Sequence, residues 1–108
     1  MAHFMLQIAY TPEAWAALVK KPHNRFDAVR SVVERMGGRI EGGWMCFGEY
    51  DGVLIVEMPD NITAAAFSMA AVAGGALKAS KTTPLMTFDE GVQAMKQAAE
   101  AGYQPPGS

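Results

Sequence analysis

The pattern of apolar and polar residues along the chain predicts four β-strands. The first contains Phe4, Leu6, Ile8 and Tyr10 at a spacing of two, and its aromatic and β-branched side chains are typical of a strand. A glycine-bounded turn over residues 48–52 joins the second strand to the third so closely that the two must form an antiparallel hairpin. The predicted strands are residues 4–10, 39–47, 53–58 and 77–88.

Apolar residues spaced three and four apart predict four helices. Thr11 and Pro12 suit the N-cap and the first position of a helix, and Thr87 and Glu90 have the spacing of a capping box. Glycine pairs stop the second and third helices. The predicted helices are residues 12–21, 24–36 and 62–73, and a last one that follows the final strand. The residues of the first helix that we expect to face inward are Trp15, Leu18 and Val19.

The order of these elements is β-α-β-β-α-β with an extra C-terminal helix. It predicts an α+β, ferredoxin-like domain with a four-stranded antiparallel sheet and helices on one face. The strand over residues 53–58 is apolar on both faces, which is typical of a strand covered on both sides. Because the chain has no second layer to spare, a homodimer or higher homo-oligomer is the expected cover. We expect one domain over residues 1–102 and a flexible tail over residues 103–108, where the chain is polar and rich in proline.

Composition narrows the classes of function and location. The chain has 108 residues, of which 50% are apolar, and a net charge of −2, so no basic excess favours nucleic acid. No stretch is long and apolar enough to predict a membrane span, and no secretory signal is recognisable. Cys46 is the only cysteine, which excludes an intramolecular disulfide and favours the cytoplasm.

The turn and the strand that follows it carry a recognisable motif. Gly48-Glu49-Tyr50-Asp51 precedes Val-Leu-Ile-Val-Glu-Met-Pro-Asp, and the chain resembles the GYD-domain family, whose signature is G-x-Y-D before an apolar strand that ends in E-x-P-D. The resemblance covers nearly the whole domain. It implies a small α/β barrel built from two chains, the dimeric α/β-barrel type, and it carries no activity over to this chain.

Two interpretations of the motif residues remain open. Asp51 could accept backbone hydrogen bonds while the Tyr50 ring anchors the hairpin, or both could act as proton acceptor and donor in a cleft. Glu57 and Gln7 are polar residues in apolar strands, and each could either pair structurally or orient a ligand. We expect a ligand, if there is one, between sheet and helices. The candidate ligand-binding residues are Tyr10, Trp44, Tyr50, Asp51, Glu57 and Gln7.

No cofactor or metal site is predicted from sequence spacing. Neither His3 nor His23 has a second ligand near it in the sequence, and Cys46 is interpreted as a small buried hydrophobe. Packing explains the methionines, so we expect core positions for Met5, Met36, Met45, Met58, Met69, Met86 and Met95. The leading hypothesis is a small-molecule binding or assembly module. The alternative is a cofactor-free monooxygenase- or isomerase-like enzyme, for which Glu57, Asp51 and His3 are the available bases.

Overall fold

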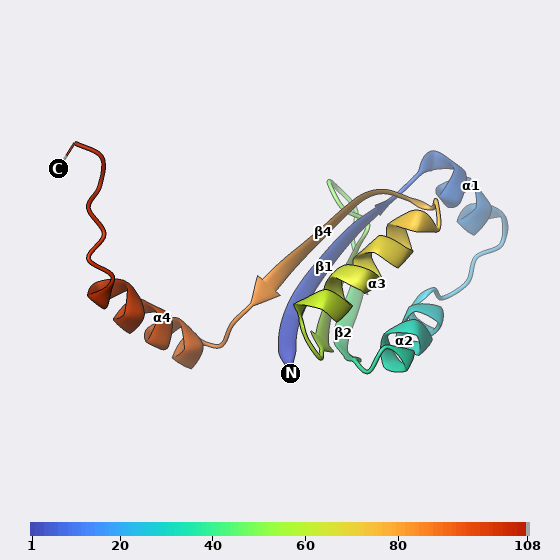
Figure 1. The fold of residues 1–108 in the computed structure, drawn as a ribbon. Helices are drawn as coiled ribbons and strands as arrows, with labels where there is room; N and C mark the ends of the chain where they lie inside the picture. The colour runs from blue at the N-terminus through green and yellow to red at the C-terminus, as the bar shows by residue number, and fades with distance from the viewer. Residues whose placement is uncertain (108) are drawn as a thin grey trace.

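The computed structural model describes residues 1–107 and shows an α+β, ferredoxin-like fold (Figure 1). Its single antiparallel sheet has the strand order β2-β3-β1-β4, so β2 and β4 are the edges. Pro84, which has no amide hydrogen to donate, lies in the edge strand β4, where such a residue is tolerated. The elements are β1 (Ala2–Tyr10), α1 (Pro12–Lys20), α2 (Phe26–Arg35), β2 (Arg39–Met45), β3 (Gly52–Met58), α3 (Asn61–Ala73), β4 (Leu77–Leu85) and α4 (Phe88–Glu100).

Local capping chemistry fixes where the helices begin. The Thr11 hydroxyl accepts the Ala14 amide at 3.0 Å, and Pro12 occupies the first position of α1, as predicted. Asp60 caps α3 by accepting from the Thr63 amide at 2.8 Å, and this hydrogen bond is the main cause that lowers the pKa of Asp60.

The predicted capping box of α4 is also confirmed, because Thr87 and Glu90 exchange side-chain-to-backbone hydrogen bonds. The Thr87 amide is the main cause that lowers the pKa of Glu90. At the end of α2, Gly37 has a φ of 85°, the left-handed conformation that a glycine adopts without cost.

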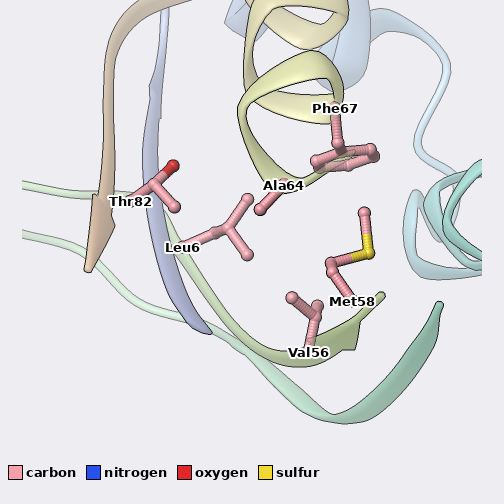
Figure 2. A pocket seen from close by; sticks show the side chains of 6 residues that line it. All are labelled: Leu6, Val56, Met58, Ala64, Phe67 and Thr82. Atoms are coloured by element: carbon pink, nitrogen blue, oxygen red, sulfur yellow. The ribbon is translucent and has the colours of Figure 1, made fainter. Parts of the chain in front are cut away.

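The core lies between one face of the sheet and the helices α2 and α3. Figure 2 shows part of it, where side chains from β1, β3 and α3 meet around a gap that leaves no space for a water molecule. This gap itself therefore has no room for a ligand. The buried apolar residues that form this core cluster are Phe4, Leu6, Val33, Val56, Met58, Ala64 and Phe67.

Several packing expectations are wrong. Val19 points to solvent with 73% of its surface exposed, because α1 lies at the end of the sheet and covers little of it. Of the methionines expected in the core only Met58 is fully buried, and Met5 and Met36 are half-buried. The exposed methionines are Met45, Met69, Met86 and Met95.

A register shift in β2 overturns the simple alternation expected there. Ile40 pairs with Val56, but the next paired residue is Gly42, opposite Ile55, so Glu41 is an extra residue in the strand. After this bulge the faces exchange, and Trp44 lies on the opposite side of the sheet from Ile40. The strand also ends at Met45, which leaves the Cys46 thiol exposed rather than buried.

The sheet surface away from α2 and α3 is uncovered within residues 1–107, and we call it the open face (Figure 1). Cross-strand register arranges this face in three rows. Its middle carries an apolar patch of Met5, Val53 and Ile55. The rows are Trp44–Val53–Gln7–Lys81, Gly42–Ile55–Met5–Thr83 and Arg39–Glu57–His3–Leu85.

The C-terminal helix α4 stands away from the sheet (Figure 1). None of its residues is buried, and Phe88 and Met95 are 98% and 70% exposed. No helix among residues 1–107 combines the length and the apolar character that a membrane crossing requires.

Candidate functional site

Asp51 connects three elements at one end of the sheet. Its Oδ2 accepts the backbone amide of Tyr10, at the end of β1, at 2.9 Å and the indole Nε1–H of Trp15, on α1, at 3.2 Å. Its own amide donates to the Ile8 carbonyl at 2.7 Å, and its carbonyl accepts the Cys46 amide at 2.9 Å. The β2–β3 turn is therefore held to β1 and α1 by a single residue.

The neighbours of Asp51 support its structural interpretation. The rings of Tyr10 and Trp15 pack edge to face with centroids 5.4 Å apart, which orients the indole N–H toward the carboxylate. The Tyr50 carbonyl accepts the Cys46 thiol at 3.2 Å, whereas its hydroxyl has no hydrogen-bond partner within residues 1–107. A proton-transfer pair would require the two side chains to share a ligand, and here Asp51 is already engaged by two donors.

Trp15 is the residue of this cluster that sequence reasoning missed, because its helical spacing predicted an ordinary core contact. The usable signal was chemical. A partly buried indole needs an acceptor for its N–H, and the nearest carboxylate that the topology supplies is Asp51.

Two other candidates, Gln7 and Trp44, lie on the open face in the same row, on either side of Val53. Trp44 is 64% exposed, and its indole covers Gly42 so closely that a Cβ there would lie 2.8 Å from the ring. Glycine at position 42 is thus required for this orientation of the indole. The structure separates Trp44 from the interior site expected for it.

The sixth candidate, Glu57, lies at the far end of the open face. It lies five positions along β3 from Gly52, the residue next to Asp51, which corresponds to about 17 Å along an extended strand. Its carboxylate contacts His3 through Oε1 at 3.0 Å and Arg39 through Oε2 at 2.9 Å, and the same His3 Nε2 lies 2.8 Å from Glu41 Oε1. The candidates therefore lie in three places: at the Asp51 end of the sheet, in the row that contains Trp44 and Gln7, and in the row that contains Glu57. They do not form a single pocket.

Away from these residues, an open groove of about 420 Å³ lies beside α3, on the core side of β4. It is mostly apolar, and a 2.6 Å hydrogen bond between the hydroxyls of Ser68 and Thr82 forms part of its floor. None of the predicted ligand-binding residues lines it.

Comparison with known proteins identifies the family. The profile that describes the GYD domain matches residues 4–100, nearly the whole chain. The chain belongs to the GYD-domain family. A search of curated protein sequences finds no match.

Among solved structures, the GYD domain is similar to the crystal structure of MtbAldR, with a TM-score of 0.57 and 15% sequence identity. That alignment covers 80% of this chain and 53% of the other, so this chain spans about half the length of that protein. It is also similar to the crystal structure of FFRP-DM1, with a TM-score of 0.49, 13% identity, and coverage of 80% and 100%. At this level of identity the similarity to MtbAldR shows the ferredoxin-like fold alone, and the similarity to FFRP-DM1 supports no further conclusion.

Proposed function

We propose that this GYD-domain protein is an assembly and small-molecule binding module in which two copies stack through their open faces. The observation that carries the proposal is the apolar patch of Met5, Val53 and Ile55, which no helix within residues 1–107 covers. Contiguous exposed apolar surface marks interaction sites, because its burial drives association. A second copy is the simplest cover, since a two-fold pair matches the same patch with itself.

Stacked sheets would enclose the ligand candidates of the open face. Trp44 offers an aromatic surface and Gln7 an amide that can both donate and accept, one on each side of Val53. A small planar molecule with at least one hydrogen-bonding group fits this chemistry. Tyr10 and Asp51 then serve as the structural end of the sheet that supports the site.

The proposal also includes that the protein does not bind nucleic acid and that it works in the cytoplasm, and charge and cysteine content support these two points. A net charge of −2 offers no electrostatic attraction to nucleic acid. Cys46 is a free thiol, which suits a reducing compartment such as the cytoplasm.

Sedimentation of three lysine variants tests the assembly. Ile55→Lys places a charge on the open face, where it would be buried and unpaired between two sheets at a cost of several kcal/mol. We expect this variant to remain folded by circular dichroism and to sediment as a single chain of 11.6 kDa. Val56→Lys, one position along the strand, enters the core, where Val56 is 1% exposed, and should unfold the chain.

The matched control is Val19→Lys, which also replaces an apolar β-branched residue by lysine but at an exposed position of α1 away from the open face. It should sediment like the wild type, above the mass of one chain. A wild-type protein that sediments at 11.6 kDa at micromolar concentration, or an Ile55→Lys variant that still assembles, would refute the proposal.

A further inference from the structure

Three strands bring one imidazole and two carboxylates together in the far row of the open face. His3 on β1 is paired across the sheet with Glu57 on β3, and Glu41 comes from the bulge of β2. Nε2 of His3 lies 2.8 Å from Glu41 Oε1 and 3.0 Å from Glu57 Oε1, and the three atoms all lie within 4.8 Å of one another.

The bulge explains how Glu41 reaches this position. Because Ile40 and Gly42 pair with consecutive residues of β3, Glu41 is unpaired and its side chain is freed from the regular ladder. Bulges of this kind re-aim single side chains and are frequent beside functional sites. In a regular strand, without the bulge, each residue of β2 would pair with one residue of β3, and Glu41 would be held in that ladder.

A single proton on the imidazole cannot form a full hydrogen bond with both carboxylates. The Nε2 atom of histidine can carry only one hydrogen, yet carboxylate oxygens from two residues approach it within hydrogen-bond distance. A metal ion accepts the imidazole lone pair and one oxygen from each carboxylate at the same time. Zinc bonds of about 2.0–2.2 Å in a tetrahedral site correspond to ligand–ligand separations of about 3.3 Å, so the two distances from His3 Nε2 to the carboxylate oxygens need to open by less than an ångström.

We propose that His3, Glu41 and Glu57 bind one divalent transition-metal ion of the Zn²⁺ type. Imidazole nitrogen favours such a metal over Ca²⁺ or Mg²⁺, and three protein ligands leave a fourth position open. Arg39 holds the second oxygen of Glu57 at 2.9 Å, which leaves Oε1 to face the ion, as outer-shell partners of metal ligands do. All three ligands come from one chain, so the site does not depend on the proposed stacking.

Calorimetric titration of untagged, EDTA-treated protein with ZnCl₂ at pH 7.5 tests the site, and the visible absorption of added Co²⁺ reports the coordination. We expect one ion per chain and a melting temperature that rises with zinc concentration. His3→Ala and Glu41→Gln should each weaken binding by at least about tenfold. Neither side chain belongs to the core, so both variants should keep the wild-type circular dichroism spectrum.

Two controls exclude zinc bound elsewhere on the surface. His23→Ala removes the other histidine, and Cys46→Ser removes the exposed thiol, and both variants should bind zinc like the wild type. If the wild type binds no zinc, or if binding survives in His3→Ala or is lost in His23→Ala or Cys46→Ser, the proposal is overturned and the cluster is an ion-pair network only.

Discussion

The hydrogen bonds of Asp51 permit a quantitative prediction about the end of the sheet. Asp51→Ala removes the acceptor shared by the Tyr10 amide and the Trp15 indole. Hydrogen bonds to a charged group contribute about 1.5–3 kcal/mol each, and this carboxylate is half-buried, so the lower value applies to both. We therefore expect the free energy of unfolding to fall by about 3 kcal/mol.

Conservative variants distinguish the contribution of the negative charge of Asp51 from that of its hydrogen-bond acceptor. Asp51→Asn keeps one oxygen that can accept from both donors, and its cost should stay within about 1 kcal/mol. Trp15→Phe removes the indole N–H but keeps an aromatic ring against Tyr10, and should cost about 1–2 kcal/mol. Because both single changes break the same hydrogen bond, the double variant should lose less than the sum of the two.

Thermal melts followed by circular dichroism, supported by urea titrations, measure these differences. For a domain of this size each kcal/mol lowers the melting temperature by about 4–8 °C, so Asp51→Ala should melt more than about 10 °C below the wild type. The control is Glu49→Ala, an exposed carboxylate in the same turn, which should change stability by no more than about 0.5 kcal/mol. If Asp51→Ala melts like this control, the structural role assigned to the carboxylate is wrong.

Three further predictions concern other positions. Tyr50→Phe should leave the melting temperature within about 1–2 °C of the wild type, which is equivalent to about 0.3 kcal/mol, because the hydroxyl has no hydrogen-bond partner within residues 1–107. A larger fall would show that the hydroxyl makes a stabilising contact. Gly38→Ala should lower the free energy of unfolding by about 1–3 kcal/mol, since the new Cβ would lie 2.6 Å from the Glu57 carbonyl oxygen and against the buried Met58 sulfur. Urea titrations measure this change, and an unchanged midpoint would contradict the packing. The Thr63 amide lowers the pKa of Asp60 below its ordinary value of 3.8, so this cap stabilises the folded state above that pH and stops doing so as the pH falls through the lower, folded-state pKa. Acid titration of Asp60→Asn should therefore show a shallower loss of stability below pH 4 than the wild type, and identical curves would refute the assignment.

Sequence patterns determined the order of elements and most of their boundaries, because these depend on neighbouring residues. Period-two spacing located β1, and the apolar run after the glycine-bounded turn located β3. Capping residues such as Thr11 and Thr87 fixed helix starts through hydrogen bonds three residues away. In the doubly apolar β3, Val56 lies in the core and Ile55 on the open face, and the second copy of the chain that the sequence predicts as the cover of Ile55 stays a prediction.

Tertiary structure alone decided which residues meet. The bulge at Glu41 exchanges the faces of β2, so it moves Trp44 away from the interior that regular alternation assigned to it, and no local pattern announces a one-residue register shift. The same shift brings Glu41 to His3, which lies 38 positions earlier and looks isolated along the chain. Trp15 and Asp51 are 36 residues apart in the sequence. They meet because the pairing of β1 with β3 brings Asp51 to the end of β1, where α1 begins, and only the completed sheet fixes this position.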